Sequence, residues 1–302
     1  MPGLTLDRPA VMGIVNVTPD SFSDGGRYLD AARAVAHGLE LVAAGADVLD
    51  VGGESTRPGA APVGPEEEIR RVVPVIRGLT AGTDVPVSVD TMKAEVAAAA
   101  LDAGATVVND VSAGRADPAM LPLVARAGAG FIAMHMLGTP ATMQDNPTYD
   151  DVVVEVCDFL ERRLEEAVGA GVAGERLVAD PGIGFGKTTE HNLELLRRLP
   201  ELVDRLAPVP VLIGTSRKAF IGRILAGPDA PAAALPVDER EEGTLATVVW
   251  AFDHGAAMVR VHDVRPAAEA ARLLADLAAA TPTDPDREVS WRAQDPHKTK
   301  RG

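Results

Sequence analysis

The stretch Val85–Asp110 reads VPVSVDTMKAEVAAAALDAGATVVND and contains one complete structural unit. Val85–Asp90 and Thr106–Asp110 are short, valine-rich runs, as expected for strands that are buried on both faces. The alanine-rich segment Ala94–Ala103 between them has a helical pattern. A strand, a helix and a second strand in this order indicate parallel strands joined by a right-handed crossover.

The same unit recurs over most of the 302-residue chain. We expect further strands at Val11–Val17, Asp47–Val51, Phe131–His135, Leu177–Asp180, Val209–Ile213 and Met258–His262. Helical patterns lie at Asp30–Ala44, Glu66–Leu79, Asp151–Ala170, His191–Leu199 and Arg265–Ala279. Such strands can close into a barrel or remain an open doubly wound sheet, and periodicity alone leaves both open.

Polar residues at the strand ends favour the barrel. They end or follow the strands in turn: Asn16, Glu54, Asp90, Asn109, His135, Asp180, Ser216 and His262. In a TIM barrel the carboxyl ends of all strands meet on one rim, where the active site forms. We therefore predict a TIM (β/α)8 barrel over residues 1–279. Residues 280–302 are rich in proline and charge without an apolar period, so we expect a disordered tail there.

The chain carries a formal net charge of −15. Such a surface repels phosphate backbones, so we expect no binding of nucleic acid or of an anionic membrane. If the substrate is also anionic, the site needs local cations of its own. The single cysteine, Cys157, allows no disulfide within the chain, and no apolar segment has the length of a membrane span or the pattern of a leader. We expect a cytoplasmic protein.

Asp90, Asn109 and Asp180 each lie at the end of a predicted strand and form one candidate group. A buried aspartate beside an asparagine can accept hydrogen bonds from the donor edge of a guanidine-like heterocycle. Alternatively, each aspartate could cap the helix that follows its strand. A cap explains one aspartate well, whereas several polar ends on one rim favour a pocket.

Two rim loops have compositions that suit a metal or a phosphate. The segment after Asn16 is dense in Asp, Ser and Gly, whose oxygens suit Mg²⁺, although the same residues also form ordinary turns. In Asp50–Gly59, Thr56 offers a hydroxyl and Arg57 a planar fork for a phosphate, or else the loop is simply solvated.

Cations and one aromatic ring lie near the last predicted strands. Lys218, Arg260 and His262 occupy the region where phosphate often binds in this fold, although a lone histidine is more often structural. We expect Arg217 to point outward. Phe185, in the glycine-rich segment after Asp180, has a ring that can stack on a flat ligand.

Segments along nearly the whole chain resemble the dihydropteroate synthase family. They are NVTPDSFSDGG at Asn16–Gly26, DVGGESTRPG at Asp50–Gly59, SVDT at Ser88–Thr91, NDVS at Asn109–Ser112, HMLGTPATMQ at His135–Gln144, DPGIGFGK at Asp180–Lys187, GTSRK at Gly214–Lys218 and RVHDV at Arg260–Val264. One such motif would be weak, but their order and spacing hold from about Val11 to Leu277.

The resemblance implies a TIM-barrel transferase of folate synthesis. Such an enzyme condenses 6-hydroxymethyl-7,8-dihydropterin pyrophosphate with p-aminobenzoate by a dissociative mechanism, with Mg²⁺ as cofactor and with sulfonamides as competitors. The resemblance also implies a homodimer with contacts through late helices, for which the segment Thr244–Phe252 is a candidate face.

The resemblance further implies a role for each matching residue. The pterin pocket would comprise Asp90, Asn109, Asp180, Phe185, Gly214 and Lys218. The pyrophosphate cradle would comprise Thr56, Arg57, Arg260 and His262, with Asn16 as the contact to Mg²⁺. The wall of the p-aminobenzoate site would comprise Phe22, Pro58 and Ser216. The catalytic residues would be Asp24, on a mobile loop, together with Arg57 and Lys218.

Two related kinds of protein compete with this interpretation. A pterin-dependent methyltransferase domain would share the pterin pocket but would have no use for the ESTRP, SRK and RVH segments. A non-catalytic pterin-binding paralogue should have lost part of TPDSFSDGG or STRP, and both are intact. Two features depart from the family pattern: Leu137 stands where a polar residue is expected, and the loop Gly227–Glu239 is longer and richer in Ala and Pro.

Overall fold

The computed structural model describes residues 6, 8–17, 27–56, 61–227 and 235–280. Its strands are β1 (Ala10–Asn16), β2 (Val48–Gly52), β3 (Val87–Asp90), β4 (Val107–Asp110), β5 (Gly130–Met134), β6 (Leu177–Asp180), β7 (Leu212–Ile213) and β8 (Met258–Val261). Its helices are α1 (Arg27–Ala43), α2 (Pro65–Gly82), α3 (Ala94–Asp102), α4 (Met120–Ala127), α5 (Val152–Gly169), α6 (Thr189–Arg197), α7 (Leu199–Leu206), α8 (Ala219–Ala226), α9 (Glu241–Asp253) and α10 (Val264–Ala279), with short 3-10 turns at Gly174–Arg176 and Val237–Glu239. The predicted tail, residues 280–302, lies outside the described residues except for Ala280.

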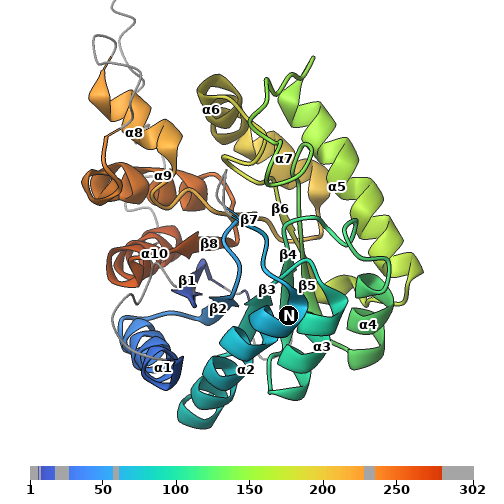
Figure 1. Ribbon diagram of the computed structural model, residues 1–302. Helices are drawn as coiled ribbons and strands as arrows, with labels where there is room; N and C mark the ends of the chain where they lie inside the picture. Colours follow the sequence, from blue (N-terminus) through green and yellow to red (C-terminus); the bar gives the residue numbers. More distant parts are fainter. Residues whose placement is uncertain (1–5, 7, 18–26, 57–60, 228–234, 281–302) are drawn as a thin grey trace, which may run out of the picture.

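The strands form one parallel sheet in the order β6-β5-β4-β3-β2-β1-β8-β7. The two ends of this sheet meet at a parallel bridge between Ala179 of β6 and Val211 beside β7. There the Ala179 N–H donates to the Pro210 carbonyl over 3.0 Å. The helices surround the strands on the outside (Figure 1). The predicted barrel is therefore confirmed and the open sheet is not.

Two strands are shorter than the sequence pattern predicts by two residues or more, and proline is the physical reason. The pattern predicts Val209–Ile213 and Val85–Asp90, whereas β7 begins at Leu212 and β3 at Val87. Pro210 and Pro86 have no N–H to donate to a strand ladder. Their carbonyl groups accept from neighbouring strands instead, Pro210 from Ala179 and Pro86 from Leu49.

Four of the helices in the described residues differ from the sequence pattern. The pattern His191–Leu199 predicts one helix, but α6 ends at Arg197 and α7 starts at Leu199, because Pro200 favours a fresh first turn. Helices α4 and α8 are not predicted, since eight residues are too few for a clear apolar period. Among the helices of the described ranges, none combines the length and the apolarity needed to cross a bilayer.

Strand residues alternate between the inside of the barrel and the helix layer. Residues such as Val11, Leu49 and Val259 pack outward into the large core shared with the helices. The inward residues form a separate apolar cluster: Ala10, Met12, Val48, Val107, Ile132, Val178, Leu212 and Met258. This cluster fills the barrel and makes a floor, and the next inward positions toward the carboxyl ends are polar.

We predict that Ile132→Ala destabilises the protein by about 2–5 kcal/mol, because Ile132 is fully buried in the floor and the change leaves a cavity. Urea unfolding followed by circular dichroism measures the effect. Val154→Ala on the outer face of α5, where the side chain is 38% exposed, serves as the control and should shift stability by about 0.5 kcal/mol or less. Equal losses in the two variants would contradict a packed floor.

Candidate active site

Arg260 of β8 reaches across the mouth of the barrel and bridges two carboxylates. Its Nε donates to Asp50 Oδ2 over 2.6 Å, and its Nη2 donates to Asp90 Oδ2 over 2.8 Å. Asn109 Nδ2 donates to the same oxygen of Asp50 over 3.0 Å. Four strands, β2, β3, β4 and β8, thus supply one connected polar group directly above the apolar floor.

Asp50 belongs to this group although the sequence patterns did not single it out. It lies in the middle of β2, in register with Ile14 of β1 and Ser88 of β3, and it is fully buried. Its Oδ1 has no hydrogen-bond partner among the described residues, and neither has Ser88 Oγ. A buried carboxylate oxygen without a partner is costly, so this oxygen is well suited to a ligand. The signal in the sequence was a charged residue between Leu49 and Val51 in an apolar run.

The acids at the mouth have displaced pKa values. Burial raises the pKa of the Asp90 carboxyl to about 7. The nearby Arg260 guanidinium lowers this pKa, but its effect is smaller than that of burial. Burial also raises the pKa of Asp180 to about 6, opposed by the Gly182 N–H, which donates to Asp180 Oδ1 over 2.7 Å, and by Lys218 and Arg260. Acidic side chains with shifted pKa values that lie close together are typical of functional sites.

Phe185, in the loop after β6, lies next to Lys218, which directly precedes α8. Lys218 Nζ lies 3.9 Å from the centre of the Phe185 ring. The ring packs against a methionine-rich cluster beside the mouth, made of Val111, Met134, Met136 and Met143. Asp180 is in register with Met134, so this apolar wall adjoins the carboxylate. The arrangement combines a flat apolar surface with acceptors at one edge.

Ser216 and His262 meet on the rim beyond β7 and β8. Ser216 Oγ lies 2.9 Å from His262 Nδ1 and accepts the His262 backbone N–H over 3.1 Å. Gly214 lies below them, where a Cβ would be 3.9 Å from the Cβ of Arg260. The structure thus brings the candidate residues of the last two strands together.

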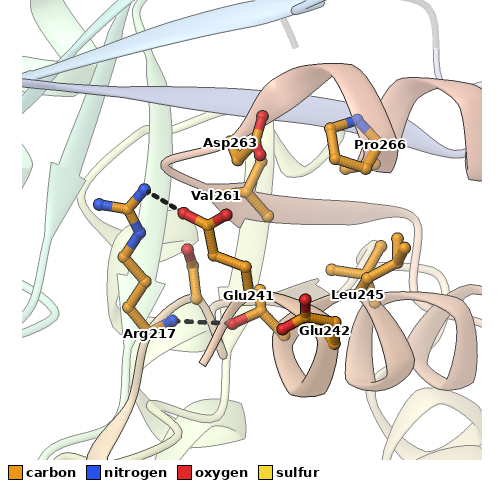
Figure 2. A pocket seen from close by; sticks show the side chains of 11 residues that line it. Arg217, Glu241, Glu242, Leu245, Val261, Asp263 and Pro266 are labelled. Atoms are coloured by element: carbon orange, nitrogen blue, oxygen red, sulfur yellow. Dashed lines mark hydrogen bonds and ion pairs between the residues drawn. The ribbon is translucent and has the colours of Figure 1, made fainter. Parts of the chain in front are cut away.

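Arg217 points away from the barrel mouth, as the sequence analysis expects. Its φ is 59°, its backbone N–H donates to Thr244 Oγ1, and its Nη2 lies 3.0 Å from Glu241 Oε1 of α9 (Figure 2). A cavity of about 200 Å³ opens here between α9 and α10. Its lining includes Ser216, Glu242 and Asp263 but not Asp90, Asn109 or Asp180, so the cavity adjoins the rim at Ser216 and does not reach the polar group at the mouth.

The first rim loops are described only in part. Asn16 ends β1 opposite Gly52, and a Cβ on Gly52 would lie 3.9 Å from Asn16 Oδ1 and 3.6 Å from the Asp90 Cβ. The glycine therefore leaves room between Asn16 and Asp90. Thr56 is partly buried. Four predicted site residues lie outside the described residues: Phe22, Asp24, Arg57 and Pro58.

Comparisons with known proteins agree with this geometry. Residues 12–262 match the family described as pterin binding enzyme. Dihydropteroate synthase of Mycobacterium leprae is 52% identical over 272 residues, which is 90% of this chain and 94% of the relative.

Solved structures agree as well. The Xanthomonas albilineans dihydropteroate synthase with 4-aminobenzoic acid superposes with a TM-score of 0.84 at 49% identity, covering 92% of this chain and 96% of that one. The same enzyme in complex with 7,8-dihydropteroate gives 0.81 at 46% identity, covering 92% and 97%. The chain therefore belongs to the pterin-binding enzymes and, among them, to the dihydropteroate synthases, which are transferases of folate synthesis.

Proposed function

We propose that the mouth of this barrel joins 6-hydroxymethyl-7,8-dihydropterin pyrophosphate to p-aminobenzoate, giving 7,8-dihydropteroate and pyrophosphate. The observation that carries the proposal is the connected group of Asp50, Asp90, Asn109 and Arg260, in which Asp50 Oδ1 has no hydrogen-bond partner among the described residues. The support from relatives is that the Xanthomonas enzyme has been solved with 4-aminobenzoic acid and with 7,8-dihydropteroate.

The pterin would lie between the carboxylates and the apolar wall. A pterin presents an amino group and ring N–H groups along one edge, and Asp90, Asp180 and the Asn109 amide oxygen are suitable acceptors. Phe185 and the neighbouring methionines offer a surface for the flat ring. Lys218 and Gly214 complete this pocket in the proposal. Asp50 would hold Asn109 and Arg260 in place through Oδ2, and its Oδ1, which has no partner among the described residues, would accept from the pterin.

The pyrophosphate would lie toward the cationic side of the rim. Thr56, Arg57, Arg260 and His262 form the proposed cradle, and they supply the local cations that a chain of net charge −15 needs for an anionic substrate. Burial lowers the pKa of Arg260, but contacts with Asp50 and Asp90 outweigh it and raise the pKa above its usual value, so Arg260 keeps its charge. Negative charge develops on the leaving pyrophosphate as the carbon–oxygen bond breaks, and fixed cations stabilise that charge.

Mg²⁺ is proposed as the cofactor. A Mg²⁺ ion usually keeps several waters and binds through one or two protein oxygens together with the substrate phosphates. Asn16, whose amide oxygen borders the space beside Gly52 and Asp90, would hold it. Bound there, the ion would neutralise charge on the leaving group.

The second half of the reaction is attack by the aryl amine. Once pyrophosphate leaves, a pterin methylene cation remains, the amine nitrogen bonds to that carbon, and the amine then releases a proton. Ser216, Phe22 and Pro58 would form the wall of the p-aminobenzoate site, with Ser216 fixed by its hydrogen bonds to His262. Asp24, Arg57 and Lys218 are the proposed catalytic residues, and Asp24 would steady the cation and exclude water.

We also propose a cytoplasmic homodimer that associates through α9 and α10. The two helices lie side by side on the outside of the barrel (Figure 1). Each exposes large apolar side chains, Val249 and Trp250 on α9 and Leu273 and Leu277 on α10. The inner face of α9, which includes Val248 and Phe252, is already buried against the barrel. The lone Cys157 is a buried free thiol, in keeping with a reducing compartment.

We predict that Arg57→Ala lowers kcat/KM for dihydropteroate formation by about 10²–10³-fold, because it removes a donor from the charge that develops on pyrophosphate. A coupled turnover assay with Mg²⁺ measures the rate. Arg77→Ala on the exposed face of α2 is the matched control and should retain full activity. Absence of product from well-folded wild type would rule out the synthase reaction and favour a non-catalytic pterin-binding protein.

We predict that pterin affinity falls as the pH drops through 7 to 6. Burial raises the pKa of Asp90 to about 7 and that of Asp180 to about 6, and a protonated carboxyl loses acceptor capacity for the pterin N–H groups. Calorimetric titration with 6-hydroxymethylpterin should show Kd rising about tenfold per pH unit between pH ~7 and ~6, and more steeply below pH ~6, where the second carboxyl is also protonated. Asp180→Asn should bind weakly with a shallower pH dependence, whereas a constant wild-type affinity down to about pH 5 would disprove binding by ionised aspartates.

We predict that Leu273→Glu shifts the protein from dimer to monomer, because a charge on an apolar interface is desolvated without a partner. Sedimentation velocity measures the assembly state. Val168→Glu on α5, which is 52% exposed on the opposite side of the barrel, is the control and should leave assembly unchanged (Figure 1). A monomeric wild type at micromolar concentration would contradict the proposed interface.

A further inference from the structure

Lys187 is a buried lysine that the proposed reaction does not use. Its side chain is 2% exposed, and its Nζ lies 2.9 Å from His135 Nδ1, 3.0 Å from the Gly182 carbonyl oxygen and 3.0 Å from the Phe185 carbonyl oxygen. A protonated ammonium has three N–H donors, so each donor has an acceptor. A neutral His135 imidazole can accept one of these donors at Nδ1. Burial and the charge of Lys187 lower the pKa of His135 to about 2, which agrees with that form.

The three acceptors belong to two rim loops that adjoin the candidate pterin pocket. Gly182 and Phe185 lie in the loop after β6, and His135 follows β5. The β6 loop contains glycines with positive φ at 182, 184 and 186, and a Cβ at Gly182 would lie 1.9 Å from the His135 carbonyl oxygen. A loop of this shape has few ladder hydrogen bonds of its own. Lys187 closes it from the inside and ties it to β5.

The same loop holds two residues of the candidate pterin pocket. Gly182 N–H donates to Asp180 Oδ1 over 2.7 Å, so a shift of the loop would move or release that carboxylate. Phe185 carries the ring that lies under Lys218 Nζ. The charge of Lys187 also lowers the pKa of Asp180, which favours the ionised acceptor. Lys187 therefore acts on both the position and the charge state of pocket groups without facing the mouth itself.

Stability alone is a poor explanation for a lysine at this position. Burying an ammonium costs free energy, and burial indeed lowers the pKa of Lys187 to about 7. Apolar residues of similar volume often stabilise a fold as well as buried charges do or better. Three convergent hydrogen bonds instead fix one loop geometry, and a binding pocket benefits from such fixed geometry.

We propose that Lys187 is a positioning residue for the pterin pocket, acting by holding the loop Gly182–Gly186 in place rather than by touching the substrate. The inference rests on the proposed function, since it takes Asp180 and Phe185 as parts of the pterin pocket.

The test replaces Lys187 by Met, which keeps the length and removes all three donors. We expect the Kd for 6-hydroxymethylpterin, measured by calorimetry, to rise about 10–100-fold. The KM for p-aminobenzoate at saturating pterin pyrophosphate should stay unchanged, because its proposed wall lies elsewhere on the rim. The matched control is Gln144→Ala, which removes an exposed 2.8 Å hydrogen bond to Gly184 of the same loop and should bind pterin like wild type.

A double-mutant cycle separates positioning from a general loss of stability. If Lys187 acts through the loop that carries Phe185, the losses in pterin affinity for Lys187→Met and Phe185→Leu are not additive. Additive losses would overturn the proposal, as would wild-type pterin affinity in a folded Lys187→Met. If Lys187→Met fails to fold, Lys187→Gln, which keeps two donors, takes its place, and failure of both variants to fold would make the residue structural and end the proposal.

Asp180→Asn distinguishes failure of this inference from failure of the proposed pocket. If Asp180→Asn weakens pterin binding but Lys187→Met does not, only the role of Lys187 is wrong. If Asp180→Asn also binds with wild-type affinity, the assignment of the pterin pocket is wrong.

Discussion

The arrangement of the candidate site depends on the two-residue period of parallel strands in a closed barrel. Each strand turns alternate side chains inward, so a residue two places beyond a floor residue lies in the mouth. Val48 and Asp50, Val107 and Asn109, Val178 and Asp180, and Met258 and Arg260 are such pairs. A one-residue shift of any of these strands would send its polar side chain into the helix layer and bring a neighbouring residue, such as Leu49, Val108, Ala179 or Val259, into the mouth.

The mouth also depends on a balance of buried charge. Asp50 and Asp180 are buried and Asp90 is partly exposed, and desolvation at the mouth raises the pKa values of Asp90 and Asp180. Arg260 offsets this tendency because it bridges Asp50 and Asp90 directly and lowers the pKa of Asp180 from a distance. One cation thus preserves acceptor oxygens on several strands. The hydrogen bond from Asn109 to Asp50 fixes the asparagine amide in the same network.

Much of this arrangement could be predicted from the sequence, and the failures have physical causes. Asp90 and Asp180 end their strands and Asn109 is the last residue but one of β4, so their position on the rim followed from the alternation of strands and helices. Asp50 could not be predicted as a site residue because it lies inside a strand, and only the register of the barrel shows that it faces inward. Lys187 contacts His135, which lies 52 residues earlier in the chain, and a local sequence pattern cannot predict a contact over that separation. Pro210 shortens β7 because it has no N–H to donate, and the run of valine, leucine and isoleucine that predicts the strand does not reflect this effect.

The closure between β6 and β7 gives the barrel an uneven wall. The strands β1 and β2 are in register over five residue pairs, whereas β6 and β7 meet only at the bridge between Ala179 and Val211. This seam runs directly below Asp180 and Gly214, two of the candidate pterin contacts. Widening the barrel along the seam breaks fewer main-chain hydrogen bonds than widening it between any other pair of neighbouring strands in the described sheet. The barrel wall beside the proposed pterin pocket can therefore open slightly between β6 and β7 while the hydrogen-bonded ladder between β1 and β2 stays closed.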